Sequence, residues 1–376
     1  MNKMKLTGIG LRHGRKFTLL LTAASLLYGC QKNNVNHNDL KDFNVVNLVA
    51  NTEEYHPKTI DQTLINAFGL AWSPNGIAWV NSVGGHVSEL YSAEGDTLRR
   101  IRIPGPSNPG DGFPTGIVFS GGQGFNLPNG PSAFLFTGFD GVLSGWNGAS
   151  GDFAQRLKTP PGASYTGLAI GRSNGQNFIY GANFGKKKID VWDTTFAFHG
   201  NFGFTDPGIP SDYSPYNIQA VGDWLFVNYA KLGADGHPVE GQSAGFTSVF
   251  KTDGSFVKRF ASGGTLDIPW GVTEAPGSFF EDQDLKAGSE AAPTNSRDPK
   301  DPVILIGNFG DGRINVFTLD GRFLGQLFTH NQPLVIEGLW ALSFAPSSSN
   351  VSQSRLYFTA GPDHENDGVF GYLIKQ

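Results

Sequence analysis

The chain has 376 residues, a formal net charge of −5, and 51 glycines and 22 prolines against only two methionines. Such a composition favours many short strands joined by tight turns and disfavours long helices, which need more alanine, glutamate, lysine and leucine. The acidic balance argues against nucleic-acid binding and against electrostatic adhesion to anionic lipid.

Residues 1–30 are predicted to be a targeting segment that is not part of the fold. Basic residues precede an apolar run from Phe17 to Leu27, which is too short to cross a bilayer as a helix. The run ends in Leu27-Tyr28-Gly29-Cys30, which resembles the bacterial lipobox, whose cysteine is acylated. Cys30 is the only cysteine, so it is the predicted lipidation site and no disulfide can form within the chain. An ordinary signal peptide with an incidental cysteine is the alternative.

The remainder of the chain is expected to form one exported domain that a lipid alone attaches to the membrane. Residues 31–41 are polar and predict a flexible tether, and residues 42–376 are assigned to a single domain. Removal of residues 1–30 leaves 23 basic against 33 acidic residues, a net charge of −10. We therefore expect a monomer at the periplasmic or outer-membrane face of a cell envelope, without a nucleic-acid partner.

Six similar segments follow one another along the chain. Each opens with an aromatic residue or proline, usually followed by glycine and then by an aliphatic residue. The openings are Phe68-Gly69-Leu70, Pro114-Thr115-Gly116-Ile117, Tyr165-Thr166-Gly167-Leu168, Pro215-Tyr216-Asn217-Ile218, Pro269-Trp270-Gly271-Val272 and Glu337-Gly338-Leu339-Trp340. Counted from positions 69, 116, 167, 217, 271 and 338, the intervals are 47, 51, 50, 54 and 67 residues. That period is typical of the blades of a β-propeller.

Each opening precedes two further predicted strands. The third strand ends at or near an aromatic residue in every segment, namely Tyr91, Trp146, Trp192, Phe250, Phe317 and Tyr372. The pattern predicts an all-β fold, a six-bladed β-propeller, because a blade buries its faces only against other blades and the ring must close. The last blade is one strand short. We expect Val45–Val49 to supply its outer strand, beside residues 368–374.

Two polar inserts interrupt the period. Residues 230–244 lie between the second and third strands of the fourth blade, and residues 274–302 lie between the first and second strands of the fifth. Long polar inserts on a regular scaffold are either functional loops or disordered segments. We predict a functional role for the first and disorder for the second.

A ligand site is expected where the loops before the first strands and those between the second and third strands meet around the central channel. The candidate ligand-binding residues are Asn81, Asp140, Asn183, Asn228, Trp270, Asn308, Asp311 and Trp340. Asn308 and Asp311 are the first of these to mutate. The alternative is that asparagine and glycine in tight turns serve only the backbone geometry.

A divalent cation such as calcium is a further possibility at the same face. The run Asp363-His364-Glu365-Asn366-Asp367-Gly368 resembles the start of a calcium-binding loop, although its twelfth position, Ile374, is not an acid. Glu337-Gly338 is similar to the metal-binding opening of gluconolactonase-like propellers but lacks their proline. The candidate metal ligands are Glu337, Asp363, Glu365 and Asp367.

Several stretches resemble an uncharacterised family of exported bacterial propeller proteins. They are residues 66–71, 307–315, 337–342, 357–363 and 368–371. The resemblance is collinear from about Asn47 to the C-terminus and departs from the family at Ala67 and at the 274–302 insert. NHL-type and gluconolactonase-like propellers are broader relatives. The resemblance implies the fold and export, and no established activity.

The sequence therefore favours an exported, lipid-anchored propeller that binds a small molecule or a protein without catalysis. The first alternative is a metal-dependent hydrolase of the gluconolactonase type, which would use Glu337 with asparagine and aspartate residues at the channel mouth. The second is a structural role in a surface assembly. The catalytic residues, if any, are unknown, because the histidines lack metal-ligand spacing.

Overall fold

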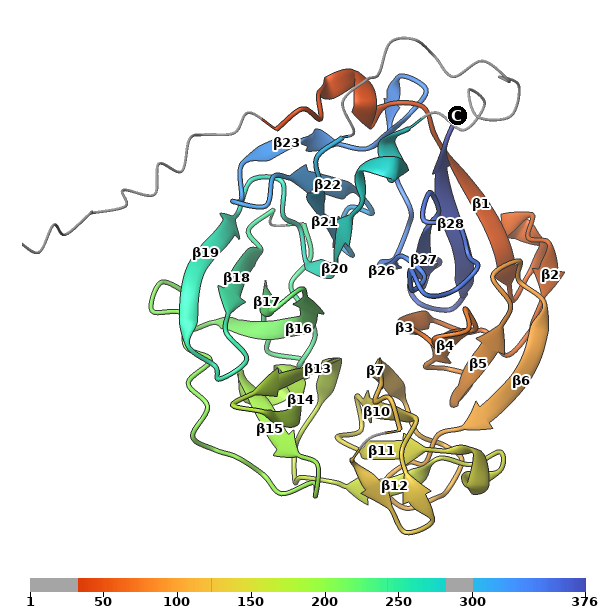
Figure 1. The fold of residues 1–376 in the computed structure, drawn as a ribbon, viewed down its shortest axis with the longest axis vertical. Coiled ribbons are helices and arrows are strands. Elements are labelled where there is room, and N and C mark those ends of the chain that lie inside the picture. The colour runs from red at the N-terminus through yellow and green to blue at the C-terminus, as the bar shows by residue number, and fades with distance from the viewer. Residues whose placement is uncertain (1–32, 123, 242, 282–299) are drawn as a thin grey trace, which may run out of the picture. The chain divides into compact units, whose positions relative to one another are not determined.

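Six β-sheets are arranged as blades around a central channel (Figure 1). The computed structural model describes residues 33–122, 124–241, 243–281 and 300–376. The predicted signal peptide and Cys30 lie outside the described residues, as does most of the 274–302 insert, for which disorder was predicted. The innermost strands contact one another in ring order, and the first strand of the sixth blade contacts that of the first. The six-bladed propeller that the sequence predicted is thus confirmed.

The first three blades span residues 67–193. Blade one consists of β3 (Ala67–Trp72), β4 (Ala78–Ser82), β5 (Val87–Tyr91) and β6 (Thr97–Arg102). Blade two consists of β7 (Pro114–Phe119), β10 (Phe134–Gly138), β11 (Leu143–Trp146) and β12 (Gln155–Lys158), with a small hairpin of β8 (Asn126–Leu127) and β9 (Gly130–Pro131). Blade three has β13 (Tyr165–Ser173), β14 (Gln176–Asn183) and β15 (Lys188–Asp193) alone.

The last three blades complete the ring. Blade four consists of β16 (Tyr213–Val221), β17 (Trp224–Lys231), β18 (Phe246–Phe250) and β19 (Phe256–Ser262). Blade five consists of β20 (Pro269–Ala275), β21 (Val303–Asn308), β22 (Ile314–Phe317) and β23 (Phe323–Gln326). Blade six consists of β26 (Leu339–Ser343), β27 (Leu356–Ala360), β28 (Val369–Lys375) and β1 (Phe43–Ala50), with β2 (Thr59–Ile60) outside β1. A hairpin of β24 (Phe328–Thr329) and β25 (Gln332–Pro333) lies between blades five and six in the sequence.

The N-terminal strand closes the last blade, as the sequence predicted. β1 pairs antiparallel with β28 from Phe43 opposite Lys375 to Ala50 opposite Val369. In Figure 1 the orange β1 lies beside the dark blue β28. Since both ends of the described chain share this sheet, the ring cannot open without breaking their hydrogen bonds.

Residues 34–41, which were expected to be a flexible tether, instead pack against the propeller. A short 3₁₀ helix spans His37–Leu40, and the side chain of Leu40 is fully buried in the core of blades five and six. The backbone N–H of Asn34 donates to Asp301 Oδ2 at 2.9 Å. Apolar side chains at positions 35 and 40 explain the difference, because burying them offsets the entropy of ordering the segment.

The glycines of the repeat openings are required by the close approach of neighbouring first strands. A Cβ atom on Gly69 would lie 2.1 Å from the carbonyl oxygen of Thr115 in the next blade, and one on Gly116 would lie 2.5 Å from the backbone nitrogen of Leu168. In blade six the ladder places Ala341 at this position, because Leu342 pairs with Phe358 as Leu70 pairs with Val80. The assignment of Gly338 to the repeat is therefore corrected.

Gly338 has a different role. Its φ is +65°, and a Cβ atom there would lie 2.2 Å from the carbonyl oxygen of Gly361. It is a turn glycine in the loop before β26, where a left-handed backbone is needed.

None of the helices in the described part of the chain has the length and apolar character needed to cross a bilayer. The remaining short 3₁₀ helices span Glu53–Tyr55, Gly148–Ser150, Phe184–Lys186 and Gly277–Phe280.

Candidate functional site

One end of the channel is closed by the side chains that precede the repeat glycines or their replacements. Four blades place an aromatic residue there, namely Phe68, Tyr216, Trp270 and Trp340. The rings of Phe68 and Trp340 stack with centroids 3.8 Å apart, and Trp270 meets Phe68 edge-on at 5.2 Å. Phe68 and Trp340 are fully buried and Trp270 is 4% exposed. The predicted site residues Trp270 and Trp340 thus lie at the axis and close it.

The polar atoms of these two indoles are used inside the protein. Trp270 Nε1 donates to the carbonyl oxygen of Thr166, on the first strand of blade three, at 2.9 Å. Trp340 Nε1 donates to Asn66 Oδ1 at 2.8 Å. Each bond joins two blades and fixes the ring orientation, so the indoles contribute shape and π-faces to the channel and no free donor.

A second set of aromatic residues comes from the loops between the second and third strands. Antiparallel pairing brings these loops to the same end of the channel as the start of each first strand. Phe309 stacks on Trp340 with centroids 4.0 Å apart, and Phe139 meets Phe68 edge-on at 5.5 Å. Phe139 and Phe309 are half-buried. Together with Phe184, which packs on Tyr216, the two sets form what we call the aromatic floor: Phe68, Phe139, Phe184, Tyr216, Trp270, Phe309 and Trp340.

A cavity of about 210 Å³ lies in the channel beyond the aromatic floor. The innermost residues of its wall include Gly69, Asn217 and Trp270, and it extends along the first strands toward their opposite ends, past Ala169 and Ala220. The sequence prediction placed the channel mouth at the loop face. The rings of the aromatic floor close the channel at that face, whereas the wall of the hollow part also includes small residues such as Gly69, Ala169 and Ala220.

Two of the predicted ligand-binding asparagines join neighbouring blades. Asn81 and Asn228 are fully buried, and their Nδ2 atoms donate to backbone carbonyls of the next first strand, Thr115 at 3.1 Å and Trp270 at 2.8 Å. In blade six, Thr359 Oγ1 donates to the carbonyl oxygen of Phe68 from the equivalent position. These side chains satisfy backbone groups at the blade interface, a structural role that differs from the turn geometry considered as the alternative from the sequence.

Asn183 and Asn308 occupy a different ladder position from Asn81 and Asn228. Asn183 pairs with Tyr165 and Asn308 with Pro269, one residue later along the second strand. A shift of one residue turns a side chain to the other face of the sheet. Asn183 Nδ2 therefore donates to Asp190 Oδ2 at 2.7 Å, and Asn308 Nδ2 donates to the carbonyl oxygen of Thr265 at 2.7 Å.

The aspartates Asp140 and Asp311 hold the turns that contain them. Asp140 accepts from the backbone N–H groups of Phe113 and Val142 at 3.2 and 3.1 Å. Burial raises the pKa of Asp140 above its usual range, and these backbone bonds oppose the shift. Asp311 Oδ1 accepts from Asn308 Nδ2 at 2.8 Å and from the backbone N–H of Arg313 at 3.1 Å.

Three consecutive residues at the channel mouth adopt a left-handed backbone. Asp363, His364 and Glu365 have φ of 51°, 53° and 68°. For residues with a Cβ atom this costs about 1 kcal/mol each. The turn brings Glu365 Oε2 within 2.5 Å of Asn66 Nδ2, the same amide that accepts from Trp340 through its oxygen. A strained backbone thus positions a carboxylate beside the aromatic floor.

The insert of blade four reaches the same place. It forms a hairpin in which Leu232 pairs with Pro238, and Leu232 packs against the core cluster that contains the aromatic floor. Burial is the main cause that raises the pKa of Glu365. The bond from Asn66 and the charge of His237 oppose the shift, and Glu240 adds to it. His237 and Glu240 are both exposed residues of this insert.

The four predicted metal ligands do not converge. Glu337 Oε1 accepts from the backbone N–H of Asp363 at 3.1 Å, and Asp367 accepts from Asn51 Nδ2 at 2.7 Å and from the hydroxyl of Tyr55 at 2.8 Å. Within the described ranges, no three His, Cys, Asp or Glu side chains are grouped as metal ligands. The carboxylates of Glu337, Glu365 and Asp367 are directed to different partners, so the structure does not bring the predicted calcium ligands together, and a cation at these residues stays a prediction.

A nucleophilic serine is not positioned either. Residues Gly171–Gly175 read Gly-Arg-Ser-Asn-Gly, which is the sequence pattern of a nucleophile elbow. In the structure they form the hairpin turn between β13 and β14, where Ser173 pairs with Gln176. A nucleophile elbow joins a strand to a helix, and here a strand follows, so the pattern has only a turn function.

Sequence reasoning missed the residues that do meet at the mouth, above all Asn66, Phe68, Tyr216, His237 and Phe309. The signal for two of them was present. Phe68 and Tyr216 precede the repeat glycine or its replacement, the same position that Trp270 and Trp340 hold in blades five and six. Asn66 and His237 lie outside the repeat positions. Asn66 nevertheless opens one of the stretches that resemble the exported family, and His237 lies in the 230–244 insert, for which the sequence predicted a functional role.

Comparison with known proteins gives sequence relatives for this chain. No protein-family model matches the chain. It is 33% identical over 335 residues to the uncharacterized protein L690 of Acanthamoeba polyphaga mimivirus, which covers 84% of this chain and 81% of that protein. It is 28% identical over 344 residues to the uncharacterized protein R648 of the same virus, with 87% and 79% covered. Among solved structures, a streptogramin B lyase superposes with a TM-score of 0.48 at 12% identity, over 88% of this chain and 96% of the lyase.

The two sequence relatives are themselves uncharacterised proteins. The reported sequence relatives are viral, so the bacterial origin that the sequence resemblance implied has no support. The activity in the name of the lyase belongs to that protein and is not assigned to this chain.

Proposed function

The chain belongs to the same family as the mimivirus protein L690, and from that premise we propose that it is a binding module without catalysis. Its ligand docks at the channel mouth, against the aromatic floor and beside Glu365. The observation that carries the proposal is the left-handed turn at Asp363–Glu365. Backbone strain of this kind persists where the surrounding structure over-determines it, and it concentrates at binding sites.

The chemistry of the mouth favours a ligand with a positively charged group. Glu365 and Glu240 both act on the hydroxyl of Tyr216, whose pKa burial raises well above its usual range and whose ring belongs to the aromatic floor. Glu337 and Asp363 are exposed nearby and joined by a hydrogen bond. Carboxylates around aromatic faces attract a cation by charge and by cation–π contact. A quaternary ammonium group, or a lysine or arginine of a peptide, has this chemistry.

Benzyltrimethylammonium is a suitable probe because it combines a cation with an aromatic ring. We expect saturable binding to the full chain by isothermal titration, and binding at least about tenfold weaker to Glu365→Gln. Glu274→Gln is the matched control, since this glutamate is exposed and lies at the other end of a first strand. It should bind like the parent.

Two outcomes would overturn the proposal. One is equal affinity of the parent and Glu365→Gln for the probe, or no saturable binding at all. The other is turnover of a simple lactone by the purified chain that depends on Glu365 and on an added divalent cation. That result would favour the metal-dependent hydrolase.

The proposal extends to the membrane. Cys30, which lies outside the described residues, would carry an acyl group after cleavage of residues 1–30, and the propeller would then sit at the surface of a cell envelope. The support is the resemblance of residues 27–30 to a lipobox in a chain with one cysteine. When the chain is expressed in a bacterium that is supplied with an alkyne fatty acid, the parent protein should become labelled and the Cys30→Ser variant should not. Equal labelling of both would remove the anchor from the proposal.

A further inference from the structure

In four blades a polar residue of the third strand faces a polar residue of the fourth. The position is defined by the ladder and is the same in each blade. The pairs are Glu89 with Arg100, Ser144 with Arg156, Ser248 with Arg259, and Asn315 with Gln326. Three of the four partners from the fourth strand are arginines, and each partner is followed by an apolar residue.

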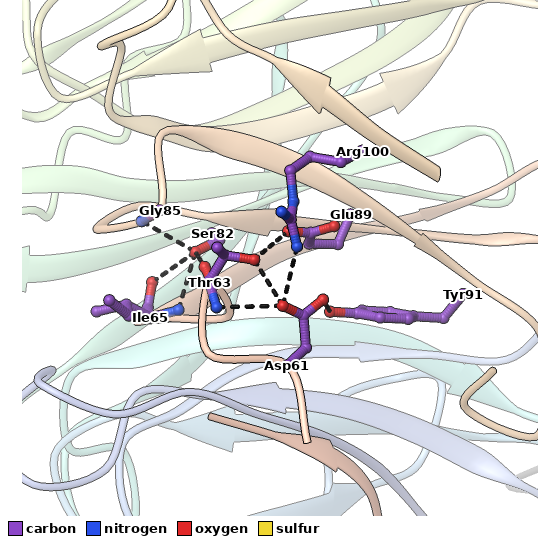
Figure 2. A network of polar contacts seen from close by, with 8 residues as sticks. All are labelled: Asp61, Thr63, Ile65, Ser82, Gly85, Glu89, Tyr91 and Arg100. Carbon is purple, nitrogen blue, oxygen red and sulfur yellow. Dashed lines mark hydrogen bonds and ion pairs between the residues drawn. The ribbon is translucent and has the colours of Figure 1, made fainter. Parts of the chain in front are cut away.

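In blade one, an arginine from the fourth strand pairs with the acidic residue at this position of the third strand (Figure 2). Glu89 is fully buried, and Arg100 Nε donates to its Oε1 at 2.5 Å while Nη2 reaches Asp61 Oδ1 at 3.0 Å. The next residue, Ile101, is also fully buried in the core between blades. The outer strand therefore supplies both a cation for a buried carboxylate and an apolar side chain.

Blade three has the carboxylate without the strand. Asp190 pairs with Gly181 as Glu89 pairs with Val80, so the two acids occupy the same position. Asp190 is 2% exposed, and its Oδ2 accepts from the hydroxyl of Tyr165 at 2.8 Å. The positive charge that pairs with Asp190 is Lys188 Nζ, which lies 2.7 Å from Asp190 Oδ1. Lys188 belongs to the same strand as Asp190, since this sheet has no fourth strand to supply a cation from the facing side.

After β15 the chain pairs briefly with the outer edge of this strand, through Ala197 and His199, and then departs from the sheet. His199 N donates to the carbonyl oxygen of Val191 at 2.9 Å, and Asp193 N donates to that of Ala197 at 3.1 Å. Residues 189, 191 and 193 therefore direct their backbone groups outward, because these groups alternate along a strand. The outward groups of Ile189 have no hydrogen-bond partner within the described ranges. In Figure 1 the green connection after β15 leads away from the sheet.

A groove of about 440 Å³ lies along this open edge. Its wall includes Asp190, Trp192, Phe198 and Pro160, the last from the neighbouring blade. Phe198 is 55% exposed, with Lys188 Nζ 5.2 Å from its ring. Among the described residues, the free outward backbone groups of this edge are those of Ile189, since Val191 and Asp193 are bonded to His199 and Ala197. Free backbone groups on an edge strand, next to a groove for side chains, are the arrangement that binds extended peptides by strand addition.

We propose that the edge of β15 binds an extended segment of a partner protein as the fourth strand of blade three. The segment carries an arginine opposite Asp190 and a bulky apolar residue next to it. The arginine displaces Lys188 from the carboxylate, as Arg100 in blade one holds Glu89 from the facing strand. The chemistry of the partner follows from the outer strands of the other blades and from the buried negative charge of Asp190.

The test uses a fluorescent peptide with the sequence of residues 97–103 of this chain, Thr-Leu-Arg-Arg-Ile-Arg-Ile. We expect saturable binding to the full chain by fluorescence anisotropy. A peptide with glutamate in place of the second arginine should bind at least about tenfold more weakly, because it sets a carboxylate against Asp190. A scrambled peptide of equal charge measures non-specific attraction to an acidic protein. Equal binding of all three peptides would overturn the proposal.

Two variants locate the binding to this edge. Ile189→Pro removes an outward N–H without touching the bonds between β14 and β15, and it should abolish peptide binding. Phe198→Ala should weaken binding several-fold with an unchanged melting temperature. Phe153→Ala is its matched control, since Phe153 is also exposed and lies under a cation, Arg102, in a four-stranded blade. Unchanged binding to Phe198→Ala and Ile189→Pro would place the peptide elsewhere.

The other occupant of such an edge is a second copy of the chain. Light scattering of the parent distinguishes it. A dimer that Ile189→Pro converts to a monomer would assign the edge to self-association and overturn the proposal of a separate partner. A monomer in both cases, with peptide binding to the parent alone, supports it.

Discussion

The two ends of the channel are built from the same six strands and have opposite character. At the loop face, Trp340 and Phe68 stack and fill the axis, whereas farther along the strands Ala169 and Ala220 leave a cavity of about 210 Å³. The difference depends on which residue of each first strand is large. This propeller therefore presents a closed aromatic surface at the loop face and a cavity at the opposite end of the channel. Substitutions can alter each end separately.

Removing the largest ring of the floor should have the largest effect. Trp340→Ala deletes a fully buried side chain and should lower the free energy of unfolding by about 4 kcal/mol. It also joins the hollow to the mouth. Urea unfolding measures the loss. Ala220→Leu, at the exposed end of the hollow, should change stability by less than about 0.5 kcal/mol, and an equal loss in both variants would contradict the contrast between the ends.

A methyl group at the repeat glycine should come next. In Gly69→Ala the new Cβ atom would meet the carbonyl oxygen of Thr115 at 2.1 Å, so two first strands must separate at the cost of about 3 kcal/mol. Gly148→Ala is the control, because a Cβ atom there has no neighbour within 4 Å. Thermal unfolding should separate the two variants clearly. Similar melting temperatures would show that the strands have room to move apart.

Loss of a blade-joining amide should be smaller. Asn81→Ala removes a buried donor to the carbonyl oxygens of Thr115 and Gly116 and should cost about 1.5 kcal/mol. Asn350→Ala, at an exposed loop position, should be neutral. Chemical denaturation of both variants checks the difference. If Asn81→Ala left the free energy of unfolding unchanged and abolished ligand binding, Asn81 would belong to the binding site that the sequence predicted.

The smallest effect concerns pH. Burial raises the pKa of Glu365 in the folded chain, so the folded state keeps this proton to a higher pH than the unfolded state, whose value is near 4.5. The contribution of this group to the free energy of unfolding is fully present below the pKa of the unfolded state. It is lost as the pH rises through the pKa of the folded state. Glu365→Gln lacks this loss. Its stability relative to the parent should therefore increase between pH 4 and pH 7, and a constant difference would contradict the assignment.

The repeat pattern of the sequence carried the architecture. Glycines at positions 69, 116, 167 and 271, with aromatic ends on third strands such as Tyr91 and Phe317, were enough to predict six blades. The short last blade also predicted the pairing of β1 with β28. These features are local or periodic, and backbone geometry and alternation determine them within each blade.

The candidate site depended on the register of the blades and on contacts between distant segments. Asn81 and Asn308 look alike in sequence, yet one residue of register turns them to different faces. Asn66 meets Glu365 and Trp340 only because the ring closes, 299 and 274 residues apart in the chain. The open edge of blade three likewise follows from where the chain leaves after His199. The sequence by itself determined the blades, because each blade's pattern is periodic, and only the tertiary structure decided which side chains meet between them.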